Sequence, residues 1–439
     1  MDRIVNLKIR FHRLLVKLRL RTAPHFNRTT PVPYKCLIFL TFLFDKISLT
    51  SKKNNKYLFY FNYVLYATIV TQLAFNLISV YTKNSELFYI QFFTAYFNIT
   101  TFINYNFVIF TNEKREKMVA FMRKHFISTH PLYNKCIRNE VRFSVIIGML
   151  FILSSFAWYV TPWFSPATDE EMQVYNFSNP SRRFSTQFWA PFDVTASPYY
   201  EIFFPFTLYS TFMVGVLSLE LFTTLPILGL HVKAQFDILS EYLTLLGHPD
   251  ILSINIKTGH ITRHNEITRY DNRLKIQQAK SFLLQIVQQH QHILTFVKTF
   301  ERNNQIFFAF RMLLTITLLL GVLCQYVFTN SQRAYIFFNL IIVMQFNFFL
   351  CTCSELINSG YYGVHKSSYN NYWYNLVFSG NGITRTLDKD IRRYLMMIMH
   401  SSPKSKYLKF KHLDIGFQTF VGSIRLTYSL FVFLFYVQK

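Results

Sequence analysis

Histidine pairs are the first residues of this chain whose types and spacing suggest chemistry. His260 and His264 lie four residues apart, and His290 and His292 flank one glutamine. Neither pair has a carboxylate or cysteine at metal-ligand spacing, so we interpret these histidines as solvated and predict no metal site. The chain also lacks a His-Glu-x-x-His sequence, a serine nucleophile elbow and a dinucleotide-binding glycine motif. We therefore expect a protein that is not an enzyme and uses no cofactor.

Charged residues within long apolar runs are the next candidates, and they are Glu220, Arg311, Glu355 and Arg425. An ionisable group inside a membrane is by default a functional candidate. A proton-coupled transporter needs more carboxylates along a path than these, so transport is disfavoured. Arg311 and Glu355 fall near the ends of their runs, where an ion pair or snorkelling costs little. We favour structural roles for these charges over gating roles.

The segments that position these residues are strongly apolar. Of 439 residues, 51% are hydrophobic, 19% are aromatic and only 15% are charged, which excludes an ordinary soluble domain of this size. The formal charge of +24 does not indicate nucleic-acid binding, because the basic residues lie between the hydrophobic runs. The five cysteines show no paired spacing outside these runs, so no disulfide framework is expected. The composition indicates a multi-pass membrane protein.

Seven apolar segments are long enough to cross a membrane as helices, which predicts an all-α fold. We place the spans at 57–81, 86–111, 143–162, 199–230, 304–328, 335–357 and 412–437. The predicted domains are a basic segment at 1–56, spans one to four at 57–230, a helical loop at 231–303, spans five and six at 304–357, a loop at 358–411 and the last span at 412–439.

The positions of the positive charges predict the orientation of the spans. Segments 1–56, 112–142, 231–303 and 358–411 carry most of the lysines and arginines, which favours a cytoplasmic location for all four. The opposite side holds only Lys83, Arg182, Arg183, Arg333 and Lys439. Seven spans then place the N-terminus inside and the C-terminus outside, with helical extensions in the cytoplasm. No continuous apolar stretch typical of a signal peptide opens the chain, which agrees with this orientation.

Three further segments carry local predictions. In residues 1–56, apolar positions at helical spacing among basic ones predict a helix lying on anionic lipid, with a solvated arm as the alternative. The run 36–44 is too short to span and predicts an interfacial or re-entrant piece. Asn176 begins a glycosylation triplet in the external segment, although similar triplets at Asn27 and Asn98 fall where glycosylation is not expected.

The stretch 268–300 is polar overall but carries an apolar stripe at helical spacing. The stripe consists of Ile276, Leu283, Ile286, Val287, Ile293, Leu294, Val297 and Phe300. It predicts a helix with one buried face, which continues into the fifth span without proline or glycine. Two interpretations stay open, because this face could pack within the subunit or against a partner.

The order of residues from 345 to 439 resembles the insect odorant receptors, which are seven-span, ligand-gated cation channels. The matching positions are Cys353, Glu355, Tyr372, Trp373, Arg392, Arg393, Leu413, Phe417 and Thr427–Ser429. The resemblance implies a subunit of the plasma membrane, in contact with membrane lipids, that binds a small volatile organic ligand. It also implies a heterotetramer with the obligate odorant co-receptor. The co-receptor itself is disfavoured as an identity, because its loop between spans four and five is longer.

Two other receptor classes remain as alternatives. An insect gustatory receptor shares this topology, but its final-span signature is incomplete here, since Leu434 occupies the position of a glutamine. A metabotropic seven-helix receptor would need the opposite orientation in the membrane.

The resemblance implies a ligand site among the outer halves of the spans, where the chain is aromatic with few polar groups. The candidate ligand-binding residues are Phe92, Tyr96, Ser154, Trp158, Tyr209, Met213 and Phe338. Trp158 is the best single candidate, because Ser154 supplies a polar group one helical turn away. The alternative is that these aromatic residues face lipid or pack between helices.

The last span carries the candidate pore residues. Phe431, Phe435 and Gln438 follow i, i+4, i+7 spacing and share one helical face. In the odorant receptors the seventh span lines the pore, so Phe431 and Phe435 would form its hydrophobic constriction and Gln438 its outer mouth. Packing of both phenylalanines against lipid or neighbouring helices is the alternative.

Overall fold

The computed structural model describes residues 56–81, 85–164, 167, 169–182, 184, 190–248, 251–256, 260–263, 272–328, 333–372, 385–400, 408–410 and 413–438. The predicted N-terminal amphipathic helix and the short apolar run at 36–44 lie outside the described residues.

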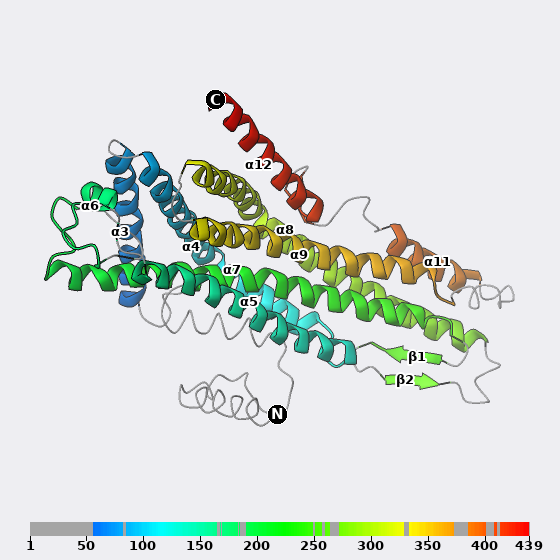
Figure 1. Ribbon diagram of the computed structural model, residues 1–439. Helices are drawn as coiled ribbons and strands as arrows, with labels where there is room; N and C mark the ends of the chain where they lie inside the picture. The colour runs from blue at the N-terminus through cyan, green and yellow to red at the C-terminus, as the bar shows by residue number, and fades with distance from the viewer. Residues whose placement is uncertain are drawn as a thin grey trace, which may run out of the picture.

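Each of the seven predicted spans falls on one long helix, which confirms the all-α membrane fold (Figure 1). These helices are α3 (Lys56–Tyr81), α4 (Ser85–His125), α5 (Pro131–Phe164), α7 (Tyr199–Thr244), α8 (Asn272–Phe328), α9 (Arg333–Tyr369) and α12 (Phe417–Gln438). The shorter elements are α6 (Asp169–Tyr175), α11 (Arg385–His400), β1 (Ile251–Asn255), β2 (His260–Arg263), β3 (Lys409–Phe410) and β4 (Leu413–Asp414). We call the end of the bundle that carries α6 the outer end and the end that carries α11 the inner end (Figure 1).

Several helices are much longer than a membrane is thick. Helix α8 has 57 residues, or about 85 Å at ~1.5 Å per residue, against a hydrocarbon core of about 30 Å. It runs unbroken through the loop region predicted to be helical and into the fifth span, as expected. Helices α7 and α9 continue beside it, so the inner end is a body of helices that extends beyond the spans (Figure 1).

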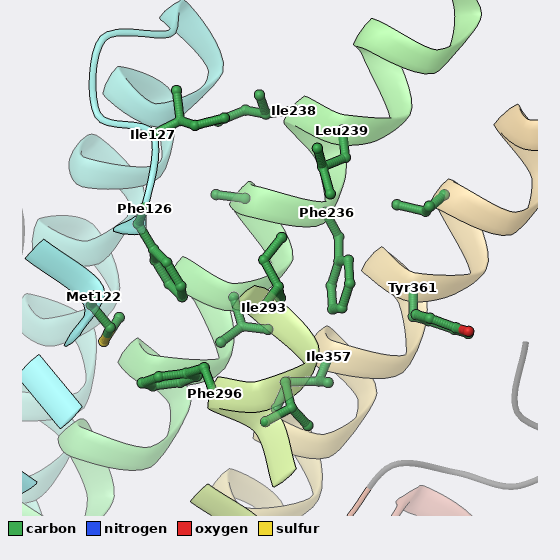
Figure 2. Close-up of a cluster of buried hydrophobic side chains, with 14 of the residues drawn as sticks. Met122, Phe126, Ile127, Phe236, Ile238, Leu239, Ile293, Phe296, Ile357 and Tyr361 are labelled. Atoms are coloured by element: carbon green, nitrogen blue, oxygen red, sulfur yellow. The ribbon is translucent and has the colours of Figure 1, made fainter. Parts of the chain in front are cut away.

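A large hydrophobic cluster fills this inner body, and we call it the inner core. It joins the inner parts of α4, α5, α7, α8 and α9 with α11. Figure 2 shows side chains from α4, α7, α8 and α9 converging there, among them Phe236, Ile293 and Ile357. The stripe predicted on α8 lies in this core: Leu283, Ile286, Val287, Ile293, Val297 and Phe300 are buried, and Leu294 is partly buried. This face of α8 therefore packs within the subunit.

Helix α8 also shows that one prediction about histidines was wrong. His290 is buried rather than solvated, because it lies on the same face as Ile286 and Ile293. Its ring stacks on Tyr361 of α9 at 5.8 Å between centroids and lies 6.2 Å from the ring of Phe236. This burial lowers the pKa of His290 to about 4. His290 is therefore a neutral core residue near neutral pH.

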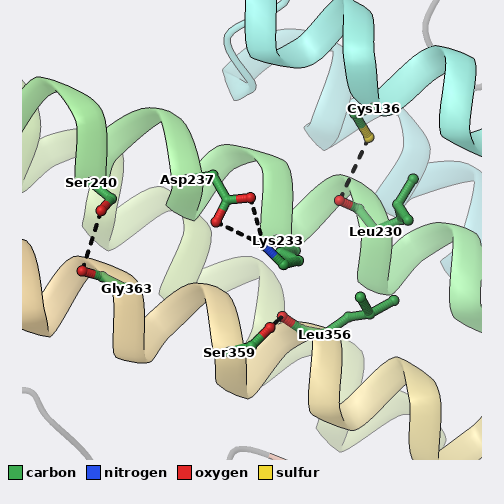
Figure 3. A network of polar contacts seen from close by, with 8 residues as sticks. All are labelled: Cys136, Leu230, Lys233, Asp237, Ser240, Leu356, Ser359 and Gly363. Carbon is green, nitrogen blue, oxygen red and sulfur yellow. Dashed lines mark hydrogen bonds and ion pairs between the residues drawn. The ribbon is translucent and has the colours of Figure 1, made fainter.

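Helices α7 and α9 pack closely because two glycines lie between them. A Cβ atom added at Gly229 would come within 2.9 Å of the Cys353 backbone oxygen, and one at Gly360 would lie 3.0 Å from the Cβ atom of Phe236. Nearer the inner end, the Ser240 hydroxyl donates to the Gly363 carbonyl at 3.2 Å (Figure 3). The small residues let the two backbones approach, and the hydroxyl fixes their relative position.

A polar cluster joins α5 to α7 just below the predicted spans. Glu140 and His231 are fully buried, with 3.2 Å between Glu140 Oε2 and His231 Nε2. The Cys136 sulfur lies 3.6 Å from the Leu230 carbonyl oxygen (Figure 3) and 3.6 Å from His231 Nδ1. Burial raises the pKa of the Cys136 thiol, so the thiol is protonated and not nucleophilic. Of the five cysteines, Cys136, Cys324, Cys351 and Cys353 are free thiols, and Cys36 lies outside the described residues.

The structure corrects the predicted start of the last span and adds strands. Helix α12 begins at Phe417 rather than at residue 412, because Ile415 is held in extended backbone by a hydrogen bond from its N–H to the Leu408 carbonyl at 3.0 Å. Both residues are buried in the inner core, which anchors the short antiparallel pair β3–β4. The antiparallel hairpin β1–β2, between α7 and α8, was not predicted either.

Candidate functional site

An aromatic ladder lines one face of α4 near its outer end. The rings of Phe88 and Phe92 are 6.0 Å apart, and those of Phe92 and Tyr96 are stacked at 5.8 Å. The four-residue spacing places all three on one side of the helix. Phe92 is 39% exposed, so this aromatic surface remains available for contact. The structure thus brings together two of the predicted ligand residues, Phe92 and Tyr96.

Tyr96 connects this ladder to a junction of four helices. Its hydroxyl is hydrogen-bonded to that of Thr317 on α8. Its ring packs on a hydrophobic cluster, here called the outer cluster, to which α4, α5, α8 and α9 contribute. The members of the outer cluster are Phe97, Ile147, Leu318, Leu319, Val322, Val343 and Phe349. The predicted spans two, three, five and six therefore meet beside Tyr96.

Tyr209 lies on the other side of α4. It packs against a separate cluster that contains Tyr66 and Tyr105. Tyr105 and Tyr96 differ by nine residues, which places them on opposite faces of the helix. The Tyr209 hydroxyl donates to Asn62 Oδ1 of α3 at 2.7 Å. In this structure Tyr209 thus joins α7 to α3, away from Phe92 and Tyr96.

For the other predicted ligand residues the structure describes the backbone but not the side chain. Ser154 and Trp158 lie on α5, Met213 on α7 and Phe338 on α9. Their side chains lie outside the described residues, so their roles stay predictions.

The segment between α5 and α7, here called the external segment after its predicted location, forms a small folded unit. Its buried residues include Tyr175, Phe177, Phe184 and Val194, which pack near the outer ends of α3 and α7. The Asp193 carboxylate accepts hydrogen bonds from the Thr195 N–H at 2.8 Å and hydroxyl at 2.6 Å.

Two residues of this unit have notable local properties, the pKa of Asp193 and the exposure of Asn176. Partial burial alone would raise the pKa of Asp193, but hydrogen bonds from Ser178 and Thr195 outweigh it and keep the pKa below its usual value. Asn176 is exposed and has a left-handed φ of 58°. This exposure suits a glycosylation site, which stays a prediction.

A cavity of about 700 Å³ between α3 and α7 was missed by sequence reasoning. It lies under the external segment and is lined largely by apolar residues, including Leu73, Phe192 and Phe206. The predicted ligand site used spans two, three, four and six, so the first span received no candidate. Aromatic residues are frequent throughout the chain, and no local signal marked those beside this cavity.

Glu355 has a clear structural role at the junction between α9 and α12. Its Oε1 atom accepts a hydrogen bond from the backbone N–H of Phe417, the first residue of α12, at 3.2 Å. A carboxylate is favourable there, because the first N–H groups of a helix lack partners and carry partial positive charge. The Phe417 ring also lies 5.7 Å from that of Phe348 on α9. These contacts fix where the last helix leaves the bundle.

The other intramembrane charges differ in exposure. Arg311 is buried, and its guanidinium lies 5.6 Å from the Phe307 ring centroid, while Phe107 stacks on that ring at 4.5 Å. This arrangement favours a packing role for Arg311. Arg425 is exposed on α12, and the side chain of Glu220 lies outside the described residues.

Helix α12 leaves the other helices over its outer half (Figure 1). Ser423 and Thr427 are buried, Phe431 is half-buried and Phe433 is 63% exposed. The side chains of Phe435 and Gln438 lie outside the described residues. The predicted pore face continues the side that carries Ser423 and Thr427, and its function stays a prediction.

A family model described as 7tm Odorant receptor matches residues 92–428, which is most of the chain. The chain belongs to the odorant receptor family. The predicted resemblance is thus confirmed well beyond the residues at 345–439 on which it rested. No sequence among curated proteins matches this receptor.

Two solved structures share the fold of this odorant receptor. The insect olfactory receptor OR5 from Machilis hrabei superimposes with a TM-score of 0.64 at 11% identity, covering 90% of this chain and 98% of the other. The same receptor in complex with eugenol gives a TM-score of 0.64 at 12% identity, covering 91% and 99%. These are seven-helix membrane proteins.

Apolar composition alone identifies fewer spans than the seven predicted for this receptor. Among the described residues, only Lys56–Ile78 and a window within Gln277–Cys324 are apolar enough to cross a membrane by composition. Helix α4 carries Gln91, Asn98 and Thr101 within its span, but all three are buried against neighbouring helices. A span can therefore be polar on the side that never meets lipid.

Proposed function

We propose that this odorant receptor binds a small volatile organic molecule in the outer half of its helical bundle and, on binding, opens a nonselective cation channel in the plasma membrane. The observation that carries the proposal is the ladder of Phe88, Phe92 and Tyr96 beside the outer cluster, where four helices meet. Aromatic faces with a few hydroxyls suit a ligand that is mostly apolar with one polar group. The eugenol complex of the Machilis hrabei receptor supports this ligand class.

The proposed channel is a heterotetramer with the odorant co-receptor. Helix α12 supports this assembly, because it carries exposed apolar residues and stands apart from its own bundle (Figure 1). Leu426, Tyr428, Phe433 and Tyr436 are all exposed on it. A helix whose outer half leaves its own bundle is available to line a pore together with neighbouring subunits.

In this channel Phe431 and Phe435 form the constriction, and Gln438 stands at its outer mouth. A ring of apolar side chains closes a narrow pore by excluding water, without full steric block. Because Phe431 is half-buried beside the face of Thr427, packing against a neighbouring helix is the competing role for this face.

The deciding experiment records odorant-evoked currents from cells that express this chain with the co-receptor, without it, and with each variant below. We expect currents only in the presence of the co-receptor. Trp158→Ala should lower odorant sensitivity without lowering surface expression, because it removes a large apolar contact from the ligand site. An absence of current with a broad panel of volatiles, despite normal surface expression, would exclude the proposed function.

The gate is tested by a matched pair of variants two residues apart on α12. Phe435→Ser should increase the leak current without ligand or alter cation selectivity, because it lets water into the constriction. Phe433→Ser is the control, since Phe433 is 63% exposed and lies on a different face. Equal effects of the two substitutions would remove Phe435 from the gate.

The proposed orientation places the inner core in the cytoplasm and the end of α12 outside. The lysines and arginines near the inner end of α4, including Lys114 and Lys117, support it. An epitope at Met1 should be reached by antibody only after permeabilisation. Labelling of intact cells would contradict this orientation and restore the metabotropic alternative.

A further inference from the structure

The cavity between α3 and α7 is a built feature of the outer half. Its volume is about 700 Å³, and residues 190–192 of the external segment cover it. The segment is held by its own small core, and the Phe192 ring lies 4.7 Å from that of Tyr199 and 6.1 Å from that of Phe203. Helix α3 packs mainly on α4 and touches α7 little. The divergence of α3 from α7 leaves the space, and the folded external segment closes it on one side.

The walls of the cavity offer apolar contact and few hydrogen bonds. The Thr68 hydroxyl donates to the Val64 carbonyl at 2.9 Å, and the Thr207 hydroxyl donates to the Phe204 carbonyl at 2.9 Å. Both donors are thus engaged by their own helices. Among the described residues of the lining, Gln72 is the third polar side chain beside these two threonines. An occupant would therefore be held mainly by dispersion.

The cavity opens sideways, where two membrane-spanning helices present apolar side chains. Phe75 is 62% exposed and Ile78 is 68% exposed on α3, and Phe206 is exposed on α7. The inner wall is closed by Leu73 and Thr207, both buried. A molecule can thus enter from the surrounding hydrocarbon without passing through water.

We propose that this cavity is a lipid site, which holds an acyl chain of a phospholipid from the leaflet around the outer half of the bundle. The cavity is apolar and open to hydrocarbon, so an acyl chain that enters it gains dispersion contacts with several walls at once. Cavities of this volume fit drug-sized molecules, so a single-ring volatile would fill only part of it. Lipid acyl chains surround the opening of the cavity and are the most abundant molecules there. The site differs from the proposed odorant site, because none of Phe88, Phe92 and Tyr96 lines it.

The probe is a phosphatidylcholine whose acyl chain carries a photoreactive diazirine, incorporated into nanodiscs with the full chain and its co-receptor. After illumination, peptides are mapped by mass spectrometry. We expect labelling at 65–78 and 190–207 to exceed that at Ile306 and Leu313, which are exposed apolar residues on α8 away from the cavity. These two positions report the background labelling of any lipid-facing surface.

Two threonines of α3 provide a matched pair of variants. Thr68 lines the cavity, whereas Thr71 does not, although both are exposed and both bond the carbonyl four residues earlier at 2.9 Å. Thr68→Trp should fill the cavity and reduce labelling to the background level. Thr71→Trp adds the same side chain elsewhere and should leave labelling unchanged. A melting curve for each variant verifies that it is folded.

Each of the following results would overturn the lipid assignment. Labelling of the wild type at the background level, or equal labelling of the Thr68→Trp and Thr71→Trp variants, would show that the cavity holds no acyl chain. Displacement of the probe by volatiles at the concentrations that open the channel would assign the cavity to odorants. Labelling that is present in the isolated subunit but absent from the complex would assign it to a neighbouring subunit. Failure of odorant-evoked currents would leave this test unaffected.

Discussion

The inner and outer halves of the bundle are held together in different ways. The inner half has one continuous core that joins six helices, whereas the outer half has separate small clusters, a large cavity and a last helix that leaves its neighbours. In the proposed orientation water surrounds the inner half, so apolar burial stabilises it. Lipid surrounds the outer half, where apolar burial gives no comparable gain. The inner half is therefore suited to hold the helices, and the outer half to change shape when a ligand binds.

In the outer half, hydrogen bonds between helices help to hold the bundle together. Tyr63 donates to Asn106 Oδ1 at 2.9 Å, and Tyr209 donates to Asn62 Oδ1 at 2.7 Å, so α3 is joined to both α4 and α7. Such bonds fix helix positions at little cost in mobility, because each is weak within a membrane.

The difference in stabilisation between the two halves is tested most directly by replacing one phenylalanine in each half. Phe236→Ala in the inner core should lower the free energy of unfolding by about 3–5 kcal/mol. The variant loses the free energy gained by moving the ring out of water, and it leaves a cavity in the core. Phe97→Ala in the outer cluster should cost less, because lipid replaces water as the surroundings. Both residues are buried in the native fold. Apparent melting temperatures in nanodiscs measure the difference, and equal losses would contradict it.

The close approach of α7 and α9 is tested by two glycines one turn apart. Gly360→Ala should destabilise the protein by about 1–3 kcal/mol, because the new Cβ would lie 3.0 Å from the Cβ atom of Phe236. Gly363→Ala is the control, since its nearest neighbour is the Ser240 hydroxyl at 3.8 Å, and Ala is the better helix former by about 1 kcal/mol. Melting temperatures that fall equally for both variants would show that this spacing is not critical.

Acid should weaken the inner half through His290. Its pKa is lowered to about 4 in the folded protein, whereas an unfolded histidine titrates near 6.5. As the pH falls from about 6.5 towards 4, only the unfolded chain takes up this proton, so stability decreases. At pH 5 we expect a loss of about 2 kcal/mol relative to pH 7.5. Thermal melts of His290→Phe should lack this component, and an unchanged pH dependence would contradict the assignment.

The smallest effect is expected in the outer half, at Tyr209. Tyr209→Phe removes the hydroxyl that donates to Asn62, and bonds of this kind within membranes contribute about 0.6 kcal/mol. A double-mutant cycle with Asn62→Ala isolates this coupling. If Tyr209 contacts the ligand instead, Tyr209→Phe should shift odorant sensitivity and show no coupling to Asn62. The result separates the predicted ligand role from the observed contact.

Features that depend on local sequence were predictable from sequence alone. The length of each apolar run predicted seven helices, because spanning a membrane needs about 20 apolar residues in succession. The stripe from Leu283 to Phe300 predicted the buried face of α8, since helical periodicity is a local property. The ordered residues from Cys353 to Thr427 indicated the odorant receptor family. In the structure two members of this series are in contact, since Glu355 accepts a hydrogen bond from the backbone N–H of Phe417.

Other features depend on how distant helices cross, and only the tertiary structure decided them. The apolar stripe on α8 indicates which face His290 shares, but only the structure shows that Phe236 of α7 and Tyr361 of α9 cover this ring. Tyr96 meets the outer cluster and Phe92 stacks on Tyr96, while Tyr209 lies across α4 from them. The rotation of each helix sets which side faces which neighbour. The cavity exists because α3 and α7 diverge beneath the external segment. Crossing angles arise from the packing of side chains far apart in sequence, so no window of the chain contains them.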